Sequence, residues 1–153
     1  MPGNERWMAT TRCIEKRDQI HIVLAQPWDS EHATIETRDF AAGTGFNKTD
    51  QAMISTVAAE LSTNILRYAG KGELFLRTVR DGDRVGVEIF AVDKGPGIKD
   101  VEKAMSDNYT TTKGSLGLGL PSVKRIMDDF EIESSREVGT RITVRKWREN
   151  GKR

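Results

Sequence analysis

The longest helical pattern in the chain opens at Asn47 or Thr49 and runs to Tyr68. Apolar residues recur in it every three or four positions, at Met53, Ile54, Val57, Leu61, Ile65 and Tyr68. This spacing places them on one face of an α-helix. Gly70 and Gly72 follow directly and are expected to end the helix. The pattern therefore predicts a long amphipathic helix with a single buried face.

Two shorter stretches show the same periodicity. The first opens at Asp29 or Ser30, where a side-chain oxygen can cap a helix, and is expected to stop at Gly43. Its buried face would carry Ala33, Thr37, Phe40 and Ala41. The second follows a glycine-rich loop and is expected to run to Asp129, with Leu120, Val123, Ile126, Met127 and Phe130 on one face.

Short runs rich in β-branched and aromatic residues predict strands between these helices. A turn at Asp81, Gly82 and Asp83 joins two of the runs into a hairpin that should be central to the sheet. A second hairpin would close the chain, and a third would form an edge near the N-terminus. The expected strands are 12–14, Gln19–Leu24, 73–80, 84–92, 130–135 and 140–147.

Composition narrows the class of protein. With 153 residues the chain is expected to form one domain, 1–153, with flexible ends at 1–10 and 148–153. A net charge of +1 gives no overall attraction to nucleic acid or to an anionic membrane. One cysteine, no apolar run of membrane-spanning length and no signal peptide favour a cytoplasmic protein. Two histidines make a histidine-rich metal site improbable.

The loop before the last predicted helix is a candidate anion site. It contains Gly114, Gly117 and Gly119, and it leads into a helix N-terminus, where unpaired amides and the helix dipole favour a phosphate. An ordinary flexible loop explains the same glycines. The segment lacks the third glycine of a dinucleotide fingerprint, so that motif is rejected. Residues 43–49 end like a Walker A loop, but Ala42 and Asn47 stand where that motif needs its two glycines, so it is rejected as well.

Three further polar residues stand at informative positions. Glu60 and Asn64 are four residues apart, so they share one face of the long helix, at the rim between core and solvent. Asp93 follows a predicted strand directly and precedes Gly95 and Gly97. A solvated glutamate, a surface asparagine and a plain turn would account for each of these features taken alone.

The order of these features resembles the N-box, G1 box and G2 box of the GHKL ATPases, which include DNA gyrase, Hsp90, MutL and the histidine kinases. Residues 60–72, 95–98, 119–125 and 146–147 resemble more closely the serine/threonine kinases of the bacterial stressosome. The resemblance implies an α/β class, in the form of a two-layer α+β sandwich of the Bergerat ATP-binding type. Its sheet would be mixed but mostly antiparallel, with helices covering one face.

The resemblance also assigns roles for ATP and Mg²⁺. Asp93 would accept a hydrogen bond from the adenine amino group, and Gly95 and Gly97 would let the backbone pass close to the base. Asn64 would supply an oxygen ligand to Mg²⁺, and Glu60 would act as general base. The phosphates would be bound by the G2 loop, that is by Lys113, Gly114, Leu116, Gly117, Leu118 and Gly119.

The phosphoryl acceptor is expected to belong to another protein, because no phospho-accepting helical domain fits in this length. The resemblance implies STAS-domain substrates and a PP2C-type phosphatase as a downstream partner, with no nucleic acid and no membrane. The polar segment 106–113 would form a lid, which Lys113 lengthens relative to the family pattern. The alternative is an anti-sigma factor or a nucleotide-gated binding module. The presence of Glu60 beside Asn64 favours the enzyme, because nucleotide binding alone would not require Glu60.

Overall fold

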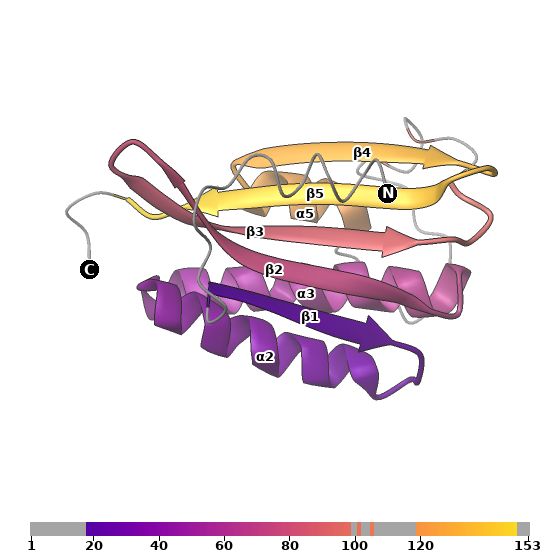
Figure 1. Cartoon of the computed structure of the whole chain (residues 1–153), viewed down its shortest axis with the longest axis horizontal. Coiled ribbons are helices and arrows are strands. Elements are labelled where there is room, and N and C mark those ends of the chain that lie inside the picture. The colour runs from indigo at the N-terminus through magenta and orange to yellow at the C-terminus, as the bar shows by residue number, and fades with distance from the viewer. Residues whose placement is uncertain (1–17, 99–100, 102–104, 106–118, 150–153) are drawn as a thin grey trace.

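A computed structural model of the chain describes residues 18–98, 101, 105 and 119–149. Within them, three helices and five strands follow the order predicted from the hydrophobic pattern (Figure 1). The expected strand 12–14 and the predicted lid 106–113 lie outside the described residues. The elements are β1 (Gln19–Leu24), α2 (Asp29–Thr44), α3 (Lys48–Tyr68), β2 (Gly72–Asp81), β3 (Arg84–Asp93), α5 (Gly119–Ile126), β4 (Asp129–Ser135) and β5 (Gly139–Trp147).

The five described strands form one sheet in the order β1-β2-β3-β5-β4. Every neighbouring pair is antiparallel, so the expectation of a mixed sheet is replaced by a wholly antiparallel one in the described part of the chain. The β2–β3 hairpin lies inside the sheet, as predicted, and turns at Gly82 with a left-handed φ of 59°. None of the described helices is long and apolar enough to span a membrane.

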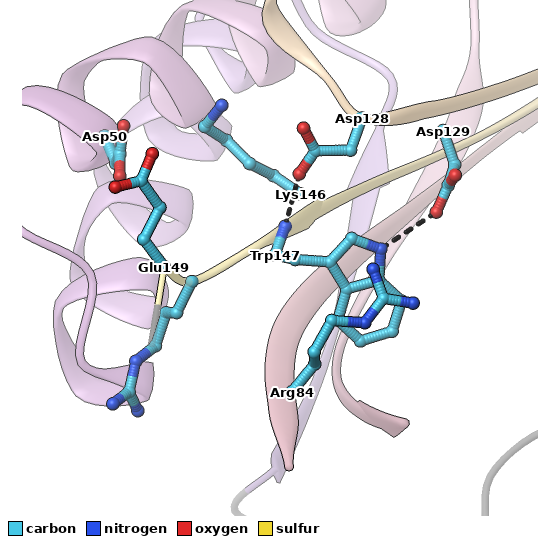
Figure 2. A pocket seen from close by; sticks show the side chains of 8 residues that line it. Asp50, Arg84, Asp128, Asp129, Lys146, Trp147 and Glu149 are labelled. Carbon is cyan, nitrogen blue, oxygen red and sulfur yellow. Dashed lines mark hydrogen bonds between the residues drawn. The ribbon is translucent and has the colours of Figure 1, made fainter. Parts of the chain in front are cut away.

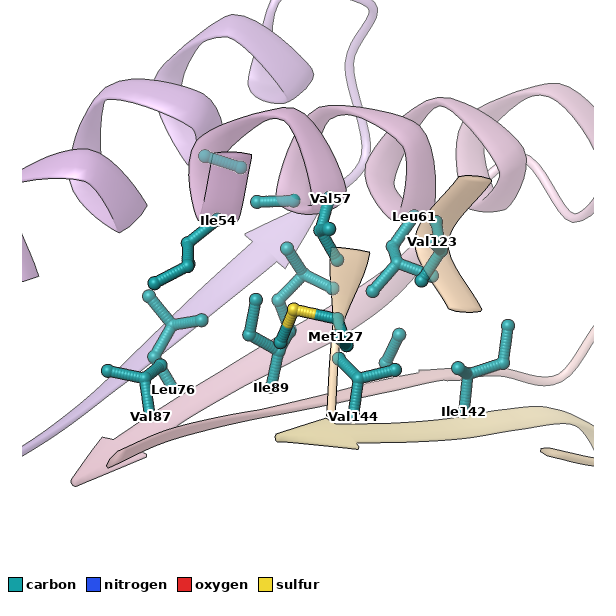
Figure 3. Close-up of a cluster of buried hydrophobic side chains, with 14 of the residues drawn as sticks. Ile54, Val57, Leu61, Leu76, Val87, Ile89, Val123, Met127, Ile142 and Val144 are labelled. Carbon is teal, nitrogen blue, oxygen red and sulfur yellow. The ribbon is translucent and has the colours of Figure 1, made fainter. Parts of the chain in front are cut away.

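The described helices lie together on one face of the sheet, which confirms the two-layer α+β prediction (Figure 1). Between the layers, the apolar stripe of α3 meets alternate residues of the central strands (Figure 3). The side chains at this interface include Ile54, Val57, Leu61, Leu76, Val87, Ile89, Val123, Met127, Ile142 and Val144. Burial of this apolar surface stabilises the fold and holds α3 and α5 against the same strands.

The ends of α2 differ from the prediction. Asp29 is the first helical residue rather than the cap, and its carboxylate accepts hydrogen bonds of 2.8 Å from the backbone N–H groups of Ala25 and Gln26. The helix also continues through Gly43 to Thr44 and stops at Gly45, which has a left-handed φ of 99°. A glycine ends a helix only where the backbone turns left-handed, and Gly43 does not.

The ends of α3 and α5 match the prediction only in part. The predicted cap of α3 is confirmed, because the Asn47 side chain accepts a 2.8 Å hydrogen bond from the Asp50 N–H. Tyr68, predicted on the buried stripe, is 48 % exposed at the last position of α3. Helix α5 ends at Ile126 rather than Asp129, because the Asp128 N–H already donates to the Arg145 carbonyl at 2.9 Å, where β4 begins to pair.

Candidate active site

Helix α3 carries the first pair of predicted site residues. Its stripe of Val57, Leu61 and Ile65 is buried against the sheet, which leaves Glu60 and Asn64 at the edge of the buried face. Both side chains are half-buried, as the sequence predicted. A polar side chain in this position is anchored by its helix and is still accessible to a ligand.

The environment of Glu60 alters its acidity. Burial raises the pKa of the Glu60 carboxyl above its usual range. A hydrogen bond from the Gly119 backbone N–H and the positive charge of Arg67 oppose this rise, because each favours the ionised form. A carboxylate with a raised pKa is a stronger proton acceptor than an exposed one, which suits it to general-base chemistry near neutral pH.

Asp93 ends β3 on the face of the sheet that carries the helices, because it continues the alternation of the buried residues Ile89 and Ala91. Its Oδ1 accepts a 2.8 Å hydrogen bond from the Gly95 N–H. Burial raises the pKa of Asp93, and hydrogen bonds from the backbones of Gly95 and Thr140 oppose the rise. These contacts hold the carboxylate in one orientation at the strand end.

The two glycines after Asp93 are required by close packing. A Cβ on Gly95 would lie 2.6 Å from the Ala69 Cβ, so this loop rests directly on the C-terminal end of α3. Gly97 has a left-handed φ of 80°, and a Cβ there would lie 2.6 Å from the Ser135 carbonyl oxygen. Larger residues would move the backbone at both positions.

The three predicted motifs meet along the C-terminal half of α3. Gly119, the first residue of α5, hydrogen-bonds to Glu60, and Gly95 packs against Ala69. Asn64 lies between these two contacts on the same helix. Five other predicted site residues lie outside the described part of the chain, namely Lys113, Gly114, Leu116, Gly117 and Leu118.

Sequence reasoning missed residues that shape the surroundings of Asp93 and Glu60. A Cβ on Gly72 would lie 3.1 Å from the Asp93 Cβ, and a Cβ on Gly139 would lie 2.1 Å from the Asp93 carbonyl oxygen. Thr140 supports Asp93 from the neighbouring strand. Arg67 also acts on Glu60 through its charge. Of these missed residues, only Arg67 could have been linked to the site from the sequence, because it follows Glu60 by seven residues, or two helical turns, and so lies on the same helix face.

A cavity of about 450 Å³ lies elsewhere, at the opposite end of β3 from Asp93 (Figure 2). Several of its polar groups are engaged within the fold. The Trp147 backbone N–H donates to Asp128 at 2.7 Å, its indole N–H donates to Asp129 at 3.0 Å, and the Arg84 guanidinium lies 4.2 Å from the ring centroid. The cavity is lined by Asp50, Arg84, Asp128, Asp129, Lys146, Trp147, Arg148 and Glu149, none of which is a predicted site residue.

Comparison with solved structures returns a histidine kinase domain. The catalytic domain of histidine kinase ThkA is 19 % identical to this chain, with a TM-score of 0.47. The similarity covers 83 % of this chain and 95 % of the ThkA domain.

Comparison of the sequence with curated proteins and families is more specific. The profile of the histidine kinase-like ATPase domain matches residues 25–146. The serine/threonine-protein kinase RsbT of Bacillus subtilis is 43 % identical over 130 residues, which are 85 % of this chain and 97 % of RsbT. An anti-sigma F factor of a Thermoanaerobacter species is 30 % identical over 101 residues, 63 % of this chain and 69 % of that factor. The chain therefore belongs to the histidine kinase-like ATPase family and, within it, to the family of RsbT-type serine/threonine-protein kinases.

Proposed function

We propose that this kinase transfers the γ-phosphoryl group of ATP, with Mg²⁺, to a serine or threonine of a STAS-domain protein in a bacterial stress-signalling complex. The observation that carries the proposal is the meeting of the three motifs along α3. Glu60 is tied to the start of α5, and the loop after Asp93 packs on the same helix. In this proposal a candidate base, a candidate metal ligand and a candidate adenine-binding carboxylate would therefore surround one site.

In this proposal Asp93 selects adenine. An ionised carboxylate accepts a hydrogen bond from the exocyclic amino group, which a guanine lacks at that position. The bonds from Gly95 and Thr140 orient the carboxylate before the nucleotide arrives, so little ordering is needed on binding. The closely packed Gly95 keeps a side chain away from the base.

Replacing Asp93 with alanine is expected to weaken ATP binding by about 1–3 kcal/mol, the usual cost of leaving a buried hydrogen-bonding group without its partner. Isothermal titration calorimetry with ATP and Mg²⁺ measures this loss directly. An exposed carboxylate such as Asp39, on α2, is the matched control, and its alanine variant should bind like the wild type. Unchanged affinity in the Asp93 variant would exclude the adenine assignment.

The donor set at Asn64 suits Mg²⁺ bound together with a nucleotide. Magnesium takes oxygen ligands and commonly keeps only one or two from the protein, the rest being phosphates and water. Asn64 offers one neutral amide oxygen at the half-buried edge of α3. Bound there, the ion would neutralise charge on the phosphates.

Glu60 would act on the incoming hydroxyl group. Its carboxylate takes the proton while the hydroxyl oxygen bonds to the γ-phosphorus, and the bond from that phosphorus to the bridging oxygen of ADP breaks. Phosphoryl transfer passes through a loose transition state, so positioning and charge neutralisation contribute more than the base. The start of α5 and Asn64 would supply that positioning on either side of Glu60.

The raised pKa of Glu60 predicts how the reaction depends on pH. Only the ionised carboxylate is a base, so transfer at saturating ATP should fall as the pH is lowered through this raised pKa. The loss should therefore begin at a higher pH than an ordinary glutamate would give. Profiles of the transfer rate against pH should show this acidic limb in the wild type and lack it in Glu60→Gln. The same limb in both would assign it to another group.

The proposed partners rest on the relationship to RsbT, and we propose that the chain acts as a single kinase domain. RsbT is named as a serine/threonine-protein kinase. We propose that this chain phosphorylates STAS-domain proteins and, once released, activates a PP2C-type phosphatase. Incubation with radiolabelled ATP and recombinant STAS-domain proteins should label the substrate on serine or threonine. No transfer to any of them would argue against this acceptor class.

The 30 % identity to anti-sigma F factors supports a second candidate function, in which the chain binds a sigma factor in a nucleotide-dependent way. The two functions predict different results in one assay. A wild-type chain that binds a sigma factor tightly, and transfers phosphate to no STAS-domain protein, would favour the anti-sigma function.

A further inference from the structure

The face of the sheet turned away from α2, α3 and α5, here called the outer face, has a buried centre. Phe90, Arg77 and Glu88 point to this face, because they alternate with core residues such as Leu76 and Ile89. Phe90 is 7 % exposed, Arg77 1 % and Glu88 0 %. The described helices all pack on the other face, so none of them accounts for this burial.

The burial does not extend to the β1 edge of the outer face. At the β1 edge, Val23 points to the same face and is 60 % exposed. An antiparallel sheet with one bare face exposes its outward side chains to water across its whole width. The difference between Phe90 and Val23 therefore indicates a cover that lies over the central strands and leaves the β1 edge open.

The charges at the centre also fit a covered face. The Glu88 carboxylate accepts bonds from the Arg77 Nε at 2.7 Å and from the Arg145 Nε at 2.6 Å. Next to this cluster, His21 stacks on Phe75 with ring centroids 4.4 Å apart, and Phe75 lies 6.0 Å from Phe90. An aromatic row beside an ion cluster whose carboxylate is paired through both oxygens can pack against an apolar segment without leaving that carboxylate unpaired.

The segment before β1 has the position and length to be this cover. Gln19 opens β1 and pairs with Arg77, so segment 1–17 joins the sheet, through Asp18, beside the buried cluster. Strands are about 4.8 Å apart, so a few extended residues reach β3. Segment 99–118, by contrast, leads into α5 on the helical face, and 150–153 follows Arg148, which donates to the Thr44 carbonyl at the end of α2.

Charge and composition agree with this occupant. Carboxylates on the outer face are Glu73, Glu88, Asp129, Glu131 and Glu133. Its guanidinium groups are Arg77, Arg141 and Arg145, and the ion pair of Asp81 with Arg84 at the hairpin end is neutral. The net charge of the outer face is thus −2. Segment 1–17 has four basic and two acidic side chains, so its net charge is +2. It also contains Trp7, Met8 and Ile14.

We propose that residues 1–17 dock on the outer face of the sheet in the same chain, over β2, β3 and β5. Trp7 and Ile14 would cover the aromatic row, and the basic side chains would face the acidic edge at β4. The outer face is then an intramolecular interface. Binding partners would have to use the helical face, the sheet edges or the nucleotide end.

Alkylation of single cysteines in the full-length chain tests the proposal. In a Cys13→Ser background, Thr143→Cys places a thiol beside Phe90, in the same cross-strand row. We expect this thiol to react at least about tenfold faster with a maleimide when Trp7→Ser and Ile14→Ser are added, because local opening then costs less. The Val23→Cys thiol, exposed on the same face, should change less than about twofold, since it has no cover to lose.

A third thiol verifies that the fold survives. Ser55 is 2 % exposed on the helical face, so the Ser55→Cys thiol should stay unreactive with and without the two serine substitutions. An unchanged rate for Thr143→Cys, with Ser55→Cys still protected, would overturn the proposal. Protection of Thr143→Cys that rises with protein concentration would also overturn it, because the cover would then be a second copy of the chain.

Discussion

Replacing Glu60 with glutamine is expected to lower phosphoryl transfer to a STAS-domain protein by roughly 10² to 10⁴, while ATP still binds. Glutamine keeps the size and hydrogen-bonding reach of the side chain but cannot accept the proton. The loss should lie near the lower end of that range, because a loose transition state needs less help from a base. Initial transfer rates at saturating ATP, together with calorimetric ATP affinity, measure the two effects separately.

Asn64→Ala is the matched comparison, because it alters the same helix face one turn away. Loss of an oxygen ligand to Mg²⁺ should reduce both metal-dependent ATP affinity and transfer. If the proposed roles are right, the two variants fail differently, one in chemistry alone and the other in binding and chemistry. A Glu60→Gln variant that transfers phosphate at the wild-type rate would show that Glu60 is not the base.

The largest expected effect on stability comes from the outer face of the sheet. Glu88→Ala should lower the free energy of unfolding by about 3–5 kcal/mol, because it leaves the charge of a buried arginine without its partner carboxylate. Glu88 and Arg77 are 0 % and 1 % exposed, so water cannot replace the lost interaction without opening the structure. Urea unfolding followed by circular dichroism measures the change.

An exposed ion pair of similar length provides the control. Arg84 and Asp81 are 2.6 Å apart, but their side chains are 48 % and 66 % exposed. Asp81→Ala should therefore cost less than about 1 kcal/mol, since solvent screens such a pair. Equal costs for Asp81→Ala and Glu88→Ala would mean that burial of the Arg77–Glu88 pair does not determine its contribution.

The element order and most of the fold follow from local patterns. The periodic apolar residues of α3, the turn at Gly82 and the cap at Asn47 each predicted a feature that the structure confirms. Two helix ends differed from the prediction, because Gly43 and Asp128 are compatible with more than one backbone path. At Asp128 the choice depended on pairing with Arg145, a residue distant in the sequence.

The candidate site residues were also predicted from the sequence, because Glu60, Asn64 and Asp93 stand in motifs whose residue types and spacing suit the proposed chemistry. The motifs alone did not predict which of their residues contact one another in the fold. Contact of Gly95 with Ala69 and of Gly119 with Glu60 depends on how α3, α5 and the end of β3 pack together. The raised pKa of Glu60 has the same origin, since its main cause is burial.

The sequence by itself determined which residues form helices and strands, which faces are apolar, and which motifs carry candidate chemistry. These properties depend on spacing along the chain, which is visible in the sequence. Only the tertiary structure decided that Gly72, Gly139 and Thr140 surround Asp93, and that Arg77, Glu88 and Arg145 form one buried cluster. The physical reason is that these neighbours come from different strands, and strand pairing sets their distances rather than separation in the sequence.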